Sequence, residues 1–213
     1  MSAMKLALVI VALVLAAGAA AYGPPPDDAR SLPVQGSLTT VSRIQPKFSS
    51  IASSLARRPA EVRCWSIEDW AELSEAWALY TDGSWSLAGV AAYAAKGTNR
   101  IQASPTTCAR LSTLPYTRSR PAGTELARVS VAIWALGHEA AHLAGFTSEA
   151  VAECRGLQHV RVTARALRAT ATYAAKLAAA AWRRYPARPA TYRSRECRNG
   201  GALDLRPASS VWP

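Results

Sequence analysis

Residues 137–154 read GHEAAHLAGFTSEAVAEC, and this stretch specifies the end of one helix, a short turn and the start of another. The chain just upstream, residues 129–136, is apolar nearly all round, which is typical of a buried helix. We expect this helix to run over residues 124–144 with Thr124 as its N-cap. Gly145 then supplies the left-handed residue at which such a helix stops.

The second helix is expected to begin at Thr147 or Ser148, because either hydroxyl can cap a helix N-terminus. The next proline is Pro186, so we expect this helix to run as far as Arg184. Only a few residues connect the two helices. They are therefore predicted to form a hairpin whose facing sides lie close together.

The first helix of this hairpin carries two histidines, His138 and His142, four residues apart. On a helix this spacing places both imidazoles on one face, where their nitrogens can converge on one zinc ion. Glu139 lies about 100° further around the helix axis, so it borders the site without pointing at the metal. A base that takes a proton from a metal-bound water occupies this kind of position.

A catalytic zinc ion needs a third protein ligand and one open position. Glu149 and Glu153 share one face of the second helix, and the tight turn directs that face towards the histidines. Glu149 lies nearer the turn, so we expect it to be the third ligand. Glu153 can then accept a hydrogen bond from the outer nitrogen of a ligand histidine, although spacing also allows the two carboxylates to exchange roles.

The motif HEAAH at residues 138–142, followed by SEAVAE at residues 148–153, resembles the gluzincins, the thermolysin-like HExxH zinc metallopeptidases. In that family an Asn-Glu-Ala-x-x-Asp stretch follows the helix motif. Here Ser148 stands in place of the Asn, and the spacer is far shorter than in thermolysin. The segment 137–158 is also similar to one found in small secreted proteins of actinobacteria.

This resemblance implies a zincin-like fold and the cleavage of peptide bonds in a peptide or protein substrate. It implies that the metal is Zn²⁺, bound by His138, His142 and Glu149. It also implies that Glu139 is the general base and that Glu153 supports a ligand histidine.

The only other histidine, His159, lies on the second helix. It could stabilise the oxyanion of a tetrahedral transition state, or it could be an ordinary, partly exposed helix histidine. Tyrosines could serve the same purpose, and Tyr192 is one of several that the sequence does not rank.

Residues upstream of the hairpin predict a small sheet. Residues 61–65 read as a short strand, and residues 69–80 have aromatic and leucine side chains at helical spacing. Residues 85–94 and 100–103 read as two further strands joined by a hairpin loop. The fold class expected is therefore α+β and helix-dominated, with a small antiparallel sheet followed by the active-site helix hairpin.

The N-terminus predicts export. Residues 6–21 are almost entirely apolar and follow Lys5, so residues 1–21 form either a signal peptide or a membrane anchor. Residues 22–60, rich in Pro, Ser, Asp and Arg, read as a linker that is ordered only towards its end, at residues 44–55. The metallohydrolase domain is then expected over residues 61–213. The protein is predicted to be extracytoplasmic, secreted or anchored to the membrane by the N-terminal segment alone.

Four cysteines in an exported chain predict two disulfides. Three pairings are compatible with the sequence. We favour Cys64–Cys108 and Cys154–Cys197, because each joins neighbours along the chain.

The formal net charge is +11, and the second helix carries Arg161, Arg165 and Arg168 on one predicted face. Such a stripe is usually solvated, but it could also bind an anionic cell-envelope polymer. Export excludes nucleic acid as an expected partner. The sequence thus predicts an exported zinc metallopeptidase. The alternatives are a non-catalytic envelope protein with a structural zinc site and a basic module that binds anionic cell-wall polymers.

Overall fold

The computed structural model describes residues 43–83, 86–95, 97–114 and 121–213. The predicted signal peptide or anchor at residues 1–21 lies outside these residues. Residues 22–42 of the predicted linker lie outside them as well. Across the described ranges, no helix has the length and apolar character needed to span a membrane.

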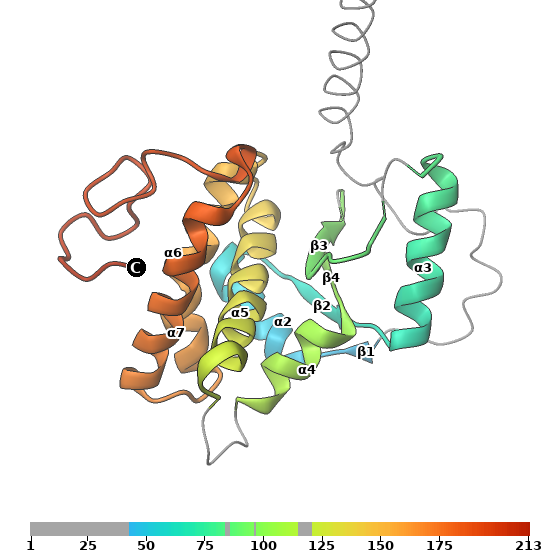
Figure 1. Cartoon of the computed structure of the whole chain (residues 1–213), viewed down its shortest axis with the longest axis horizontal. Coiled ribbons are helices and arrows are strands. Elements are labelled where there is room, and N and C mark those ends of the chain that lie inside the picture. The colour runs from blue at the N-terminus through green and yellow to red at the C-terminus, as the bar shows by residue number, and fades with distance from the viewer. Residues whose placement is uncertain (1–42, 84–85, 96, 115–120) are drawn as a thin grey trace, which may run out of the picture.

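The described residues form a helix-dominated α+β structure with six α-helices and one small sheet (Figure 1). The strands are β1 (Arg43–Ile44), β2 (Glu61–Cys64), β3 (Ala92–Ala95) and β4 (Arg100–Ala103). The α-helices are α2 (Pro46–Ala56), α3 (Ile67–Tyr80), α4 (Pro105–Thr113), α5 (Gly123–Leu143), α6 (Glu149–Ala166) and α7 (Ala171–Arg184). Two 3₁₀ turns follow, η2 (Tyr185–Ala187) and η3 (Ala190–Tyr192).

The sheet is mixed, with the strand order β1-β2-β4-β3, so the predicted antiparallel sheet was wrong in part. β3 and β4 form the expected antiparallel hairpin, and β1 is antiparallel to β2. β2 and β4 are parallel, because the chain passes through α3 and β3 before β4 returns beside β2. β3 is an edge strand and is shorter than the predicted strand over residues 85–94.

Helices cover both faces of the sheet. Alternate residues of β3 point to opposite sides, as a strand requires. Tyr93 packs with Trp77 and Leu73 of α3 on one side. Ala92 and Ala94 face the larger helical core on the other side. In Figure 1, α3 stands apart on one side of the sheet, and α5, α6 and α7 stand together on the other.

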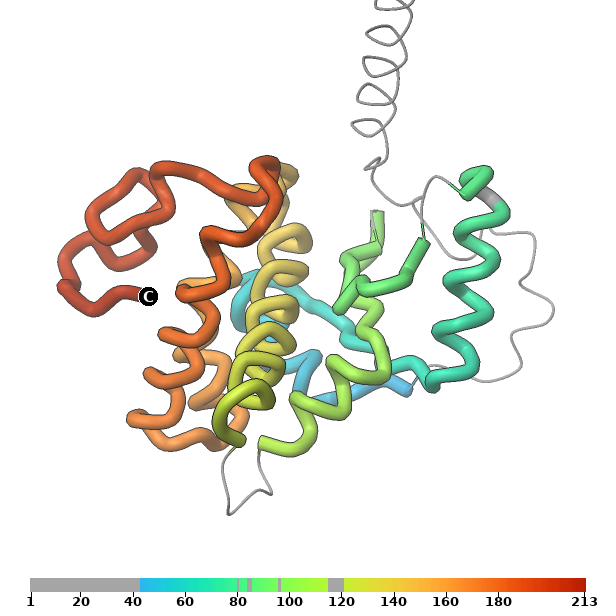
Figure 2. Tube along the Cα trace, viewed as in Figure 1, coloured from blue at the N-terminus to red at the C-terminus, as the bar shows by residue number. Residues whose placement is uncertain are grey.

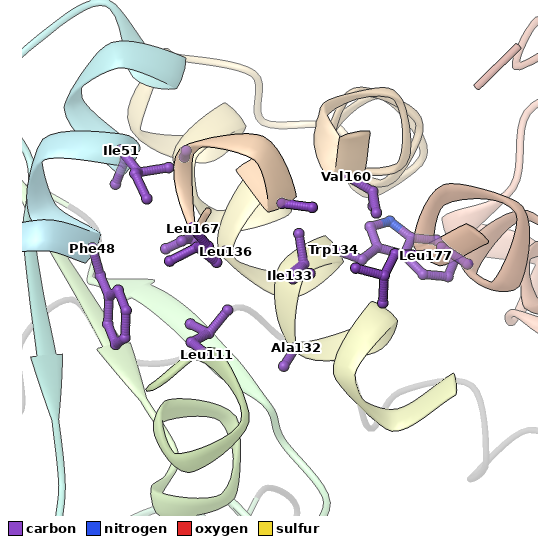
Figure 3. Packing of buried hydrophobic residues seen from close by; sticks show 14 of the residues in the cluster. Phe48, Ile51, Leu111, Ala132, Ile133, Trp134, Leu136, Val160, Leu167 and Leu177 are labelled. Atoms are coloured by element: carbon purple, nitrogen blue, oxygen red, sulfur yellow. The ribbon is translucent and has the colours of Figure 1, made fainter. Parts of the chain in front are cut away.

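The main core surrounds α5, and Figure 3 shows how side chains from several helices converge on it. The labelled buried residues are Phe48, Ile51, Leu111, Ala132, Ile133, Trp134, Leu136, Val160, Leu167 and Leu177. Two of these, Phe48 and Ile51, belong to α2. Fully burying such a side chain contributes about 1.5–3 kcal/mol to folding. The described fold therefore includes α2, which lies at the end of the predicted linker, where residues 44–55 were expected to be ordered.

The α5–α6 hairpin forms at Gly145, as the sequence predicted. Gly145 has φ +96°, in the left-handed region. Its N–H donates to His142 O, and the N–H of Phe146 donates to Ala141 O, which is the Schellman pattern of a helix C-terminus. The helix starts one residue before the expected cap, with Ala122 at the N-cap position and no side-chain capping bond.

The expected single long helix after the turn is divided into α6 and α7. Arg168 adopts φ +70°, which ends α6, and Arg165 donates a hydrogen bond to Ala169 O across the break. Thr170 then caps α7 by accepting a hydrogen bond from the Tyr173 N–H. This break lets α7 fold back against both α5 and α6.

Both predicted disulfides are present, Cys64–Cys108 and Cys154–Cys197, with Cα–Cα separations of 5.9 and 5.6 Å. Disulfides of this kind are typical of an oxidising, extracytoplasmic environment. The second disulfide attaches the C-terminal segment to α6, and Figure 2 shows that segment looping out beside the helices.

Candidate metal centre

Two glycines bring α5 and α6 into backbone contact. A Cβ atom at Gly156 would lie 2.6 Å from the backbone N of His138 and 2.9 Å from Trp134 O. A Cβ atom at Gly137 would lie 3.0 Å from Gly156 Cα. The two helices therefore cross at the level of His138, and the first turns of α6 lie beside the histidines.

The two motif histidines face each other through their Nε2 atoms, which lie 2.9 Å apart. The Nδ1 atom of each ring is engaged elsewhere. His138 donates from Nδ1 to Glu153 Oε2 at 2.6 Å, and His142 donates from Nδ1 to Phe146 O at 2.8 Å. With the protons held on Nδ1, both Nε2 lone pairs point into the same space.

Glu149 adds a carboxylate oxygen to this pair. Its Oε2 atom lies 3.2 Å from Nε2 of His138 and 3.6 Å from Nε2 of His142. Three ligands of a tetrahedral zinc ion are separated by about 3.3 Å when the bonds are 2.0–2.1 Å long. The three edges of this triangle, 2.9, 3.2 and 3.6 Å, lie around that value.

Glu139 lies next to the triangle and is buried, with 7% of its surface exposed. Its Oε2 atom accepts a hydrogen bond of 2.7 Å from the Ala94 N–H in β3. Its Oε1 atom lies 3.9 Å from Nε2 of His138. His138, Glu139 and His142 form a group that could hold a metal ion.

The charges around the histidines favour a cation. Burial by itself would lower the pKa of His138, but Glu139, Glu149 and Glu153 outweigh it and raise this pKa to about 10. Burial raises the pKa of Glu139. Burial acts in the same direction on Glu149, but the two imidazoles beside it favour the charged carboxylate and hold its pKa well below the usual range. Three carboxylates thus surround a site that is most stable with positive charge in it.

The predicted site residues divide into two groups. The structure brings together His138, Glu139, His142, Glu149 and Glu153. Glu153 makes the outer-nitrogen contact that we expected of the carboxylate that does not bind metal. His159 is absent from this group.

His159 instead lies among arginines. Burial, followed by the charges of Arg155, Arg206 and Arg57, lowers its pKa to about 4. None of the three carboxylates of the cluster is among the described groups that shift this pKa. Within the described residues, no hydrogen bond or ion pair links His159 to these carboxylates, and its role at an oxyanion stays a prediction.

Of the predicted arginine stripe on the second helix, Arg165 and Arg168 are exposed and Arg161 is half-buried. Arg161 has a buried Nε atom, and Arg165 is engaged with the Ala169 carbonyl. Arg168 lies at the left-handed break between α6 and α7.

Two residues of the C-terminal segment reach the cluster: Tyr192, which the sequence offered only as one of several unranked tyrosines, and Arg188, which the sequence did not indicate. The Tyr192 ring stacks on the His138 ring with a centroid distance of 5.9 Å and an interplanar angle of 25°. Arg188 forms an ion pair with Glu153 through its Nε atom. One signal in the sequence pointed to this segment: the predicted Cys154–Cys197 disulfide, which the structure contains, places the C-terminal tail beside the hairpin because Cys154 directly follows Glu153.

Comparisons with models of known protein families, with curated protein sequences and with solved structures gave no match.

Proposed function

We propose that this protein is an exported zinc-dependent metallopeptidase. One observation carries the proposal above the others. Two imidazole nitrogens and one carboxylate oxygen form a triangle with the edges of a tetrahedral site, while Glu139 lies beside the triangle rather than in it.

The charge of the cluster supports a divalent ion. Glu139, Glu149 and Glu153 contribute three negative charges when ionised, and Arg188 contributes one positive charge. With both imidazoles neutral the sum is −2, which a divalent cation neutralises. Two imidazoles and one carboxylate are a donor set that suits zinc and is found in catalytic zinc sites.

The two acids of α6 take different roles in this proposal. Glu149 is the third ligand, because its Oε2 atom faces both Nε2 atoms and the residue is partly exposed. Glu153 is the supporting acid, because it is 3% exposed and is bonded to Nδ1 of His138. A carboxylate in that position orients the ring and increases its basicity.

Glu139 is the proposed general base. Its Oε2 atom is held by the Ala94 N–H, which leaves Oε1 facing the triangle. Zinc, when bound, lowers the pKa of water to roughly 7 and polarises a carbonyl group. Glu139 takes the proton of the attacking water and passes it to the leaving amine nitrogen. The raised pKa of this buried acid favours its holding a proton between the two steps.

An extended peptide is the substrate class that we propose. The class rests on the gluzincin resemblance, and one feature of the structure supports it. β3 is an edge strand, and its Ala94 N–H contacts the general base, so this edge passes directly by the cluster. Unpaired backbone groups at such an edge can hold a peptide by strand addition.

The test uses the purified full-length chain, a measurement of bound metal and a broad peptide library. We expect about one zinc ion per chain and cleavage of library peptides. Glu139→Gln should retain the zinc and lose activity by a factor of roughly 10²–10⁴, the usual contribution of a general base.

The alternatives predict other results. Stoichiometric zinc without Glu139-dependent cleavage would favour an envelope protein with a structural zinc site. A folded chain that binds no zinc would exclude both zinc functions and favour a basic module for anionic wall polymers.

A further inference from the structure

The C-terminal segment is attached to the metal-site helix α6 at several points. Cys197 is disulfide-bonded to Cys154, and Gln158 both donates to Leu203 O and accepts from the Leu205 N–H. These anchors hold the chain after α7 against one side of α6. The residues between α7 and Cys197, which include η2 and η3, therefore lie close to the metal cluster.

Arg188 in this segment completes the surroundings of Glu153. One Glu153 oxygen accepts from His138 Nδ1, and the other is paired with Arg188 Nε. A carboxylate that is 3% exposed is costly to keep ionised unless both oxygens have partners. With a neutral His138, Arg188 is the cationic partner of the Glu153 carboxylate.

Aromatic rings hold Arg188 in place. Its guanidinium carbon lies 4.8 Å from the centroid of the Tyr192 ring and 5.7 Å from that of Trp134. Trp134 is itself fixed by a hydrogen bond of 2.9 Å from its Nε1 atom to Glu153 O. Tyr192 also stacks on the ring of His138. The segment thus contacts both the metal-site histidine and the acid that orients it.

We propose that residues 185–197 act as a strap that pre-organises the metal site, with Arg188 and Tyr192 as positioning residues. Arg188 fixes Glu153, which fixes the tautomer and orientation of His138, and the Tyr192 ring limits rotation of the same imidazole. This inference rests on the proposed zinc site, because it assigns residues that tune the affinity of that site.

The first experiment measures zinc affinity by chelator competition, using the full-length, disulfide-bonded chain. Arg188→Met should weaken zinc binding by roughly 10- to 100-fold, the usual effect of losing such a supporting contact. Arg188→Lys keeps the charge and should recover part of the loss. Tyr192→Phe keeps the ring and should bind zinc like the wild type, whereas Tyr192→Ala should bind it more weakly.

Arg195→Met is the matched control, because Arg195 is an exposed arginine of the same strap. It should leave zinc affinity unchanged. The visible absorption of the Co²⁺-loaded protein adds a readout of ligand geometry. Its bands should change in Arg188→Met and stay constant in Arg195→Met, which a general loss of stability would not produce.

A metal-free readout separates the strap from the proposed function. The Nδ1 proton of His138 should give a downfield NMR signal in the wild type and in Arg195→Met, and this signal should shift or disappear in Arg188→Met. Wild-type protein that binds no zinc would overturn the zinc site, and the NMR signal would still decide the role of the strap. If both Arg188 variants kept the wild-type NMR signal and the wild-type zinc affinity, the proposed role of the strap would be wrong.

Discussion

At the residue scale, the tautomers of the two motif histidines follow from the acceptors of their Nδ1 protons. Glu153 fixes His138, and the carbonyl of Phe146 fixes His142. The second acceptor is a backbone atom whose position depends on the Gly145 turn. The same turn that ends the helix therefore also prepares one of its histidines to bind a metal.

Replacing each of the two acids of α6 by glutamine should have a different effect on zinc binding. Glu149→Gln removes an anionic oxygen from the triangle, so zinc affinity should fall by more than about 100-fold. Glu153→Gln should reduce it by roughly 10- to 100-fold, because it removes only a supporting contact. Chelator competition with both variants measures the difference. If Glu153→Gln had the larger effect, the two roles would have to be exchanged.

The lowered pKa of His159 predicts that the free energy of unfolding depends on pH. Its pKa is about 4 in the folded protein because of burial and neighbouring arginines, against 6.5 ordinarily. Between these values the unfolded chain binds more protons at this position, so His159 should reduce stability as the pH falls from about 6.5 to about 4. The urea concentration at the midpoint of unfolding should therefore fall less between pH 7 and pH 4.5 in His159→Gln than in the wild type.

NMR provides the direct check on that prediction. The His159 ring signals should titrate near pH 4 in the wild type. A midpoint near 6.5 would show that burial and the neighbouring arginines do not lower the pKa of this ring.

At the element scale, the crossing of α5 and α6 determines the site. Gly137 and Gly156 allow backbone contact at His138, so both acids of α6 come within reach of the imidazoles. The spacing of the acids is apparent in the sequence, but the role of the two glycines that let the helices approach is not. Glycine in a helix interior costs about 0.5–1 kcal/mol relative to alanine, and here that cost has a structural reason.

Gly156→Ala tests the crossing. The added methyl would lie 2.6 Å from the His138 backbone, so the helices must move apart, at a cost of about 1–3 kcal/mol in unfolding free energy. Zinc affinity should fall as well, because Glu149 and Glu153 move with α6. Urea denaturation and chelator competition measure the two effects.

Gly89→Ala is the comparison for that variant. Gly89 has φ +77°, and apart from its chain neighbours no atom of the described residues lies within 4 Å of an added Cβ, so alanine should cost only about 1–2 kcal/mol of backbone strain. Its zinc affinity should stay at the wild-type value. Unchanged zinc affinity in Gly156→Ala would show that the close crossing is not needed for the site.

At the scale of the whole molecule, two disulfides of nearly equal loop length act on different parts of the fold. Cys64–Cys108 spans 44 residues and joins β2 to α4, while Cys154–Cys197 spans 43 residues and joins α6 to the strap. Chain entropy alone assigns each about 4 kcal/mol of stabilisation. Stability by itself therefore does not distinguish them.

Paired serine variants should separate stability from function. Removing either disulfide should lower the unfolding free energy by a similar amount, about 2–5 kcal/mol. Only Cys154→Ser with Cys197→Ser should also weaken zinc binding, because it releases the strap from α6. Equal zinc affinities in the two double variants would argue against an organising role for the C-terminal segment.

Local chemistry explains which features the sequence alone predicted. The i, i+4 spacing of His138 and His142 is set by helix geometry, and the end of α5 is set by the left-handed preference of Gly145. The hairpin, its group of five polar side chains and both disulfide pairs followed from relations within short stretches or between neighbouring cysteines. None of these required knowledge of how distant segments pack.

The tertiary structure decided the remainder. The parallel pairing of β2 with β4 and the inclusion of α2 in the core depend on which apolar faces meet. Arg188 reaches Glu153 across 35 residues of chain, because α7 folds back at the Arg168 break and Cys197 is tied to α6. Contacts of this kind arise from chain topology, which local periodicity does not encode. The sequence by itself thus determined the motif and its hairpin, and only the packed molecule determined what surrounds them.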